Sequence, residues 1–115
     1  IPAFCNVLPE MNHHEINAFE HHTATAKLTA SLAVIILQDP EDDPRVKNRM
    51  NMLQRILEQQ GHKTLSLQLV GTTWLQRIMQ GILTGLWTSF LLARSYHIDP
   101  EPIHIVEEFK KLIAE

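Results

Sequence analysis

The stretch LAVIILQDPEDDP, residues 32–44, gives the clearest indication of the fold class. Its first six residues are all apolar, and a short run of this kind is typical of a strand that is covered on both faces in a parallel sheet. The acidic turn that follows can begin a helix, with Pro44 in the first turn and Asp42 or Asp43 as the N-cap. The stretch therefore predicts a buried strand followed by a helix.

The next residues predict a helix and then a second strand. Apolar side chains recur at helical spacing after the turn, at Val46, Met50, Leu53 and Leu57. Gly61 can end this helix. The stretch TLSLQLV, residues 64–70, alternates apolar and polar residues as a strand does. Because the connecting helix is long enough for a right-handed crossover, we expect the two strands to be parallel.

A long apolar helix is predicted over residues 74–96, with Thr72 or Thr73 as its cap. Its uncharged part, residues 78–93, is shorter than the roughly 20 apolar residues of a membrane span and includes polar side chains. We therefore expect a helix buried inside a protein, with Trp74 and Trp87 in the core.

Two glycines lie on one face of this long helix. Gly81 and Gly85 are four residues apart, and each costs about 1 kcal/mol relative to alanine in a helix interior. The pair indicates that a neighbouring helix or strand approaches closely. A last helix is predicted within residues 102–115, after Asp99 and Pro100.

The predicted fold class is α/β, with a parallel sheet flanked by helices. The expected order is helix, strand, helix, strand, helix, helix, in one domain that spans all 115 residues. Two strands make a poor sheet by themselves. We therefore expect the back part of a domain whose first strands lie upstream or come from another chain.

Composition narrows the classes of function. The chain is 44% hydrophobic and 20% charged, as in ordinary globular proteins, and its net charge of −3 gives no basic surface for nucleic acid. One cysteine, Cys5, excludes an internal disulfide and fits a reducing cytoplasm. The chain starts at Ile1 with no signal-peptide pattern, so we expect a part of a longer chain or a processed product.

The stretch MNHHEINAFEHH, residues 11–22, has three interpretations. It can be a metal site, a segment for acid–base catalysis, or a polar helix rich in histidine. Asn12 and Glu15 resemble a capping box in which the asparagine caps the helix and the glutamate occupies position N3. This pattern predicts a helix over about residues 13–28.

The metal interpretation fails on spacing. A His-Glu-x-x-His site needs a second histidine four residues after the first, and after His14 that place is taken by Ala18. His14 and His21 share a helical face, but no carboxylate or cysteine completes a set of ligands. We predict no metal and no cofactor.

The remaining interpretations divide the histidines. His21 and His22 fit a solvated helix. His13 stands at the predicted first turn, where the partial positive charge of unpaired amides disfavours the imidazolium. A neutral imidazole near pH 7 can accept and return a proton, as general acid–base catalysis requires. His13 is therefore the candidate catalytic group of the motif.

Three blocks of the sequence resemble one enzyme family. They are LPEMNHHEINAFE at residues 8–20, AVIILQDPEDDPRVKNRMNML at residues 33–53, and SFLLARSYHIDPEPIHIVEEFKKL at residues 89–112. Their order and spacing are similar to those of bacterial and archaeal bifunctional phosphoglucose/phosphomannose isomerases. The resemblance departs at His14 and at the pair Ala18 and Phe19, where the family has asparagine and glycine–tryptophan.

The resemblance implies a fold, a reaction and partners. The family has two sugar-isomerase (SIS) domains with flavodoxin-like three-layer architecture, and this chain corresponds to most of the C-terminal one. The implied reaction interconverts glucose 6-phosphate or mannose 6-phosphate with fructose 6-phosphate through a cis-enediol, without a metal. The implied partners are the phosphorylated hexose and a second copy in a homodimer, with no nucleic acid and no membrane.

The same resemblance implies site residues. His13 matches the histidine that assists ring opening and reaches the partner subunit's active site, and Lys110 matches a lysine close to the sugar ring. Asn12 and Glu15 are implied as substrate-binding neighbours, although Glu15 also has a structural explanation as an N3 cap. The base that moves the proton between C1 and C2 would precede Ile1, as would most phosphate-binding residues.

Two readings of function follow from these residues. The first is an aldose–ketose isomerase of which this chain is the C-terminal SIS domain. The second is a non-catalytic SIS module that binds a phosphosugar as a regulatory ligand or serves only in dimerisation. Lys110, without the resemblance, would be a surface lysine near a helix C-terminus.

Overall fold

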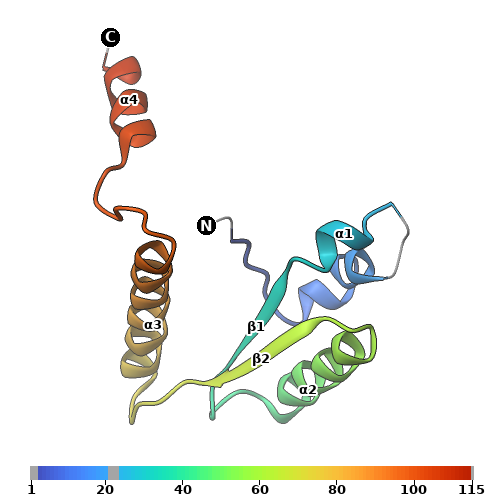
Figure 1. The fold of residues 1–115 in the computed structure, drawn as a ribbon. Helices are drawn as coiled ribbons and strands as arrows, with labels where there is room; N and C mark the ends of the chain where they lie inside the picture. Colours follow the sequence, from blue (N-terminus) through green and yellow to red (C-terminus); the bar gives the residue numbers. More distant parts are fainter. Residues whose placement is uncertain (1–2, 21–23, 115) are drawn as a thin grey trace. The chain divides into compact units, whose positions relative to one another are not determined.

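A computed structural model describes residues 3–20 and 24–114 of the chain (Figure 1). The chain divides into two compact units, one that ends at Gly81 and one that begins at Ile82. The boundary falls inside the long helix, and each unit is described by itself.

The described residues contain two strands, four α-helices and two 3-10 helices. The strands are β1 (Ala33–Gln38) and β2 (Lys63–Gln68). The 3-10 helices are η1 (Glu10–Asn12) and η2 (Glu15–Phe19). The α-helices are α1 (Ala26–Thr29), α2 (Pro44–Gln59), α3 (Trp74–Ser95) and α4 (His104–Ile113). No helix among them is both long enough and apolar enough to cross a membrane.

The two strands lie side by side and are parallel, as Figure 1 shows. Val34 pairs with Thr64 and Ile36 with Ser66, so strand residues that share a face line up across the sheet. The sheet is flanked by α2, and Leu53 and Leu57 of that helix pack against Val34. The predicted α/β class with a parallel sheet and flanking helices is confirmed.

The opposite face of the sheet is open within this unit. Ile35, Leu37 and Leu65 are 55%, 48% and 56% exposed. The prediction of a strand covered on both faces is therefore wrong for the described part of the chain. The reason is that α2 covers the face of Val34 and Ile36, and successive strand side chains point to opposite faces.

The signals at the two ends of α2 are confirmed. Asp43 is the N-cap, and its carboxylate accepts a hydrogen bond of 2.8 Å from the amide of Arg45. Gly61 has a positive φ of 80° after the last turn. The amide of Gly61 donates to the carbonyl of Glu58, and the amide of His62 donates to that of Leu57. This pair of bonds is the Schellman motif, which favours glycine at its left-handed position.

The helix predicted over residues 13–28 is wrong. The described residues form η1, η2 and the single turn α1 in its place, and residues 21–23 lie outside the described part. Leu8, Met11, Ile16 and Phe19 all pack toward α2. They form two pairs three residues apart, and the three-residue turn of a 3-10 helix puts such pairs on one side. Packing has therefore overridden the capping pattern.

The long helix α3 begins as predicted. The amide of Gln76 donates to Thr73 Oγ1 at 3.3 Å, while the amide of Thr73 donates to Gln76 Oε1 at 3.2 Å. This reciprocal pair is a capping box with Thr73 as the cap. A Cβ on Gly81 would lie 3.2 Å from Leu69 Cδ2, so the predicted close approach exists at Gly81, whereas nothing described lies within 4 Å of a Cβ on Gly85.

The predicted burial of α3 is wrong. Its one buried residue among those described is Arg77, while Trp74 and Trp87 are 65% and 61% exposed. A helix that is apolar on most sides needs neighbours on most sides, and neither unit supplies them by itself.

Candidate functional site

The part of the histidine motif that the structure describes, residues 11–20, is called the histidine segment, and apolar side chains anchor it on α2. Met11 is 8% exposed and forms the core cluster with Leu53 and Leu57. Ile16 and Phe19 pack against the same cluster. His13 and Glu15 lie between these anchors in the sequence and are exposed. The segment thus turns its apolar side to the core and its motif to the outside.

His13 does not lie in the first turn of a helix, as the sequence pattern predicted. Its amide donates to the carbonyl of Glu10 at 3.1 Å, so His13 is the C-cap of η1 and its amide is already paired. No α-helix begins at this residue. The argument that a helix N-terminus keeps the imidazole neutral is therefore wrong, and the candidate role of His13 depends on its exposure and its neighbours.

Asn12 has a different role from the predicted cap. It is the last residue of η1, and its amide donates to the carbonyl of Pro9 at 3.0 Å. The side-chain Oδ1 is buried and accepts no hydrogen bond from the described residues. Leaving a buried acceptor unpaired costs about 1–3 kcal/mol.

Glu15 loses its structural explanation as an N3 cap. It is the first residue of η2, whose N-cap is His14, and no side-chain capping bond forms there among the described residues. The Glu15 side chain is exposed. Its role as a substrate contact or as a group that orients His13 stays a prediction.

Lys110 lies in the second unit, in the last turn of α4. Its Nζ donates to Glu107 Oε1 at 2.8 Å, and both side chains are more than half exposed. The i,i+3 pair holds the ammonium along the helix surface. Asn12, His13 and Glu15 lie in one segment of the first unit. Lys110 lies in the second unit.

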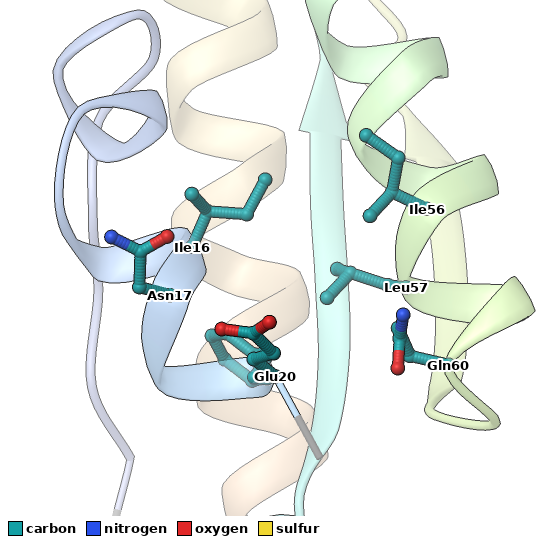
Figure 2. A pocket seen from close by; sticks show the side chains of 7 residues that line it. Ile16, Asn17, Glu20, Ile56, Leu57 and Gln60 are labelled. Atoms are coloured by element: carbon teal, nitrogen blue, oxygen red, sulfur yellow. The ribbon is translucent and has the colours of Figure 1, made fainter. Parts of the chain in front are cut away.

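A pocket of about 240 Å³ lies between the histidine segment and α2 (Figure 2). Figure 2 shows Ile16 on the side of η2, facing Ile56 and Leu57 of α2. Asn17, Glu20 and Gln60 add polar groups to its lining. His13 and Glu15 do not line this pocket. The pocket is therefore distinct from the candidate groups His13 and Glu15, which are exposed.

The structure also contains an ionic cluster that the sequence interpretation missed. Arg77 is 2% exposed, and its Nε donates to Asp39 Oδ2 at 2.8 Å. Its two terminal nitrogens donate to the two carboxylate oxygens of Glu41, and one also donates to the carbonyl of Gly71. The cluster ties the loop after β1 to the first turns of α3.

The charged groups of this cluster shift one another's pKa values. The amide of Glu41, which donates to Asp39 Oδ1 at 2.8 Å, and then the Arg77 guanidinium hold the pKa of the Asp39 carboxyl below its ordinary value of 3.8. The hydrogen bond that Arg77 donates to Asp39 in turn raises the pKa of Arg77. In sequence, the signal was Arg77 itself, the one charged residue within residues 74–93. A lone charge in an apolar helix indicates a buried partner.

In residues 3–20 and 24–114, no three histidine, cysteine, aspartate or glutamate side chains gather closely enough to hold a metal ion. His21 and His22, which were predicted to be solvated, lie outside the described residues.

Comparison with known proteins gives one family. Residues 1–113 match the family described as the bacterial phospho-glucose isomerase C-terminal SIS domain. The chain is 30% identical over 110 residues to a bifunctional phosphoglucose/phosphomannose isomerase of Aquifex aeolicus. It is 28% identical over 114 residues to a protein of the same name from Caldicellulosiruptor bescii.

The two relatives are much longer than the match. The alignments cover 96% and 99% of this chain and 33% of each relative. The chain thus spans about a third of the length of the curated relatives it matches. No solved structure matches the chain.

Proposed function

Because the chain belongs to the family of bacterial phosphoglucose isomerase C-terminal SIS domains, we propose that it is the C-terminal domain of a two-SIS-domain sugar-phosphate isomerase. The reaction we propose interconverts glucose 6-phosphate and mannose 6-phosphate with fructose 6-phosphate. The names of the two relatives support this substrate class. Homodimeric assembly and a cytoplasmic location belong to the same proposal.

The observation that carries the proposal is the placement of His13. Met11 fixes the segment in the core, and His13, two residues later, is exposed. The segment therefore presents a group that can carry a proton from a fixed position.

His13 would open the ring of the cyclic substrate. Ring opening removes the proton of the C1 hydroxyl and delivers a proton to the ring oxygen, so the carbonyl forms as the ring C–O bond breaks. An imidazole can accept the first proton and donate the second. Glu15, two residues on and exposed, would orient the imidazole or a water molecule. Lys110 would place its ammonium near the ring oxygens, where it stabilises developing negative charge.

The proton transfer between C1 and C2 needs a further base. It must sit about 3 Å from the C–H bond, and we place it outside these residues, in the remainder of the full-length chain. Most of the phosphate contacts would lie there too. Their absence would remove the positioning on which the remaining groups depend.

The test compares the full-length enzyme with the 115-residue chain. The full-length enzyme should interconvert both hexose 6-phosphates with fructose 6-phosphate, and the chain by itself should show no measurable turnover. Binding of the sugar phosphates by the full-length protein without any turnover would instead establish the non-catalytic SIS module. Robust turnover by the short chain would mean that the base lies within it, with Glu15 as the first residue to replace.

Chelation tests the absence of a metal in this mechanism. The protons in the proposed reaction are moved by side chains, so activity of the full-length enzyme should survive exhaustive dialysis against a chelator. Isomerase assays before and after dialysis measure this. Loss of activity that zinc restores would contradict the proposed mechanism and revive a metal site in the histidine motif.

A further inference from the structure

His62 is the polar anchor of the histidine segment. It is 8% exposed and lies between α2 and β2. Its Nε2 is 2.7 Å from the carbonyl oxygen of Phe19, the last residue of η2. Because a carbonyl only accepts, Nε2 carries the proton of this bond. The two rings also meet edge to face, with centroids 5.5 Å apart and planes at 84°.

The backbone of His62 is fixed independently of its side chain. Its amide donates to the carbonyl of Leu57 at 3.0 Å in the Schellman motif that ends α2. The next residue, Lys63, pairs with Ala33 as the first residue of β2. Leu57, which receives the bond, is 1% exposed in the core. The imidazole therefore extends from a backbone that is tied to the core and to the sheet.

The hydrogen bond from His62 to the carbonyl of Phe19 restrains the motif through the backbone of η2. The terminal carbonyls of a helix have no partner within the helix, and His62 supplies one for Phe19. Backbone hydrogen bonds connect this end of η2 to His14. The amide of Glu20 donates to the carbonyl of Asn17, and the amide of Asn17 donates to the carbonyl of His14. His14 follows His13 directly. Apolar packing holds the segment against α2, and the directional bond fixes where η2 ends.

We propose that His62 is a positioning residue for the ring-opening step: it fixes η2 and thereby the place of His13 and Glu15. This inference rests on the proposed function, because it assigns His62 a role through His13. His62 itself does not contact substrate in this role. Its effect is geometric, and misplacing a catalytic group by about 1 Å can cost on the order of 10²-fold in rate.

Two variants separate the contribution of the His62 hydrogen bond from that of the aromatic contact. In the full-length enzyme, His62→Phe keeps an aromatic ring against Phe19 and removes the donor, while His62→Gln keeps a donor and removes the ring. We expect His62→Phe to lower kcat on cyclic glucose 6-phosphate by about 10-fold and to change turnover of open-chain substrate less. His62→Gln should recover most of the loss. His104→Phe, which changes an exposed histidine outside the segment, should leave both rates unchanged.

A second measurement does not depend on activity. Amide hydrogen exchange at residues 14–20 should be faster in His62→Phe than in wild type and close to wild type in His62→Gln, with exchange in α2 unchanged. If His62→Phe does not fold, the exchange rates of His62→Gln test the proposal: slow exchange at residues 14–20 supports it, and fast exchange overturns it.

Two further results would overturn the proposal. One is an equal loss of turnover on cyclic and open-chain substrate, and the other is unchanged exchange in a folded His62→Phe. If His13→Ala leaves cyclic turnover intact, the proposed function fails, and exchange alone then judges whether His62 holds the segment.

Discussion

The two units of the chain place their apolar side chains in opposite ways. The buried residues among those described all lie between Met11 and Arg77, in the first unit. In the second unit, Leu86, Ile105 and Phe109 are 62%, 83% and 60% exposed. The first unit has its own core, because α2 covers the strands and the histidine segment covers α2. The second unit presents apolar helix surfaces that its own residues do not cover.

The difference shows which unit can order its residues by its own packing. Burial of apolar area is the main favourable term in folding. The first unit gains it from its own residues, so it can hold Asn12 and His13 in a defined place. The second unit, with Lys110, depends on cover from other surfaces for the same kind of order. The first unit thus orders its own residues, whereas the second unit leaves its apolar side chains exposed.

The largest effect should come from removing a core side chain of the first unit. Leu57→Ala, at a residue 1% exposed, should lower the free energy of unfolding by about 2–5 kcal/mol. The matched change Leu86→Ala, at a residue 62% exposed, should alter it by less than about 0.5 kcal/mol. Urea unfolding of the 115-residue chain measures both. Similar costs at the two sites would break the comparison between the units.

A smaller effect should follow from opening the ionic cluster. Arg77→Met leaves Asp39 and Glu41 without their cation and should lower the thermal midpoint at pH 7. Arg45→Met is the control, because Arg45 pairs with Asp43 at the surface and is 89% exposed. A midpoint that falls no further in Arg77→Met than in Arg45→Met would contradict the structural role of the cluster.

The same variant should change the dependence of stability on pH. The pKa of Asp39 is lowered in the folded chain, so the unfolded chain binds more protons just below pH 3.8, and stability is lost as pH falls through the folded value. Arg77→Met should reduce this acid loss without abolishing it, because the amide of Glu41 is the larger cause of the shift. Thermal midpoints between pH 2 and pH 7 check the sign. A steeper acid loss in Arg77→Met would show that the cation does not stabilise the Asp39 carboxylate.

The smallest effect should come from the two glycines of α3. Gly85→Ala adds a methyl group where nothing described lies within 4 Å, so it should stabilise the helix by about 0.5–1 kcal/mol. Gly81→Ala places its Cβ 3.2 Å from Leu69 Cδ2, and this contact should offset part or all of the gain. Urea unfolding of both variants measures the difference. A larger gain at Gly81 than at Gly85 would mean that Leu69 does not pack there.

The elements that local signals determine could be predicted from the sequence. The predicted caps are confirmed at Asp43 and Gly61 for α2 and at Thr73 for α3, as is the parallel pairing of β1 with β2. Each depends on contacts within a few residues or on the length of one crossover. These interactions are present in the sequence pattern itself.

The features that depend on packing could not be predicted in the same way. Asn12 and Glu15 have the spacing of a capping box, yet Met11, Ile16 and Phe19 pull the segment into 3-10 turns. The bond from Arg77 to Asp39 joins residues 38 apart in the sequence. His62 likewise reaches Phe19 across 43 residues. Long-range partners of this kind leave no periodic signal.

The measurement that tests the account most directly concerns His13. In the full-length enzyme, His13→Ala should slow turnover of cyclic glucose 6-phosphate by about 10²–10⁴-fold, the usual contribution of one acid–base group. Exchange of the C2 proton in substrate supplied in the open-chain form should change far less, because the proposed mechanism assigns that step to a different base. Isomerase assays and proton exchange on both forms give the two ratios. A selective loss on the cyclic sugar is the predicted result, and an equal loss on both substrates would remove His13 from the ring-opening step.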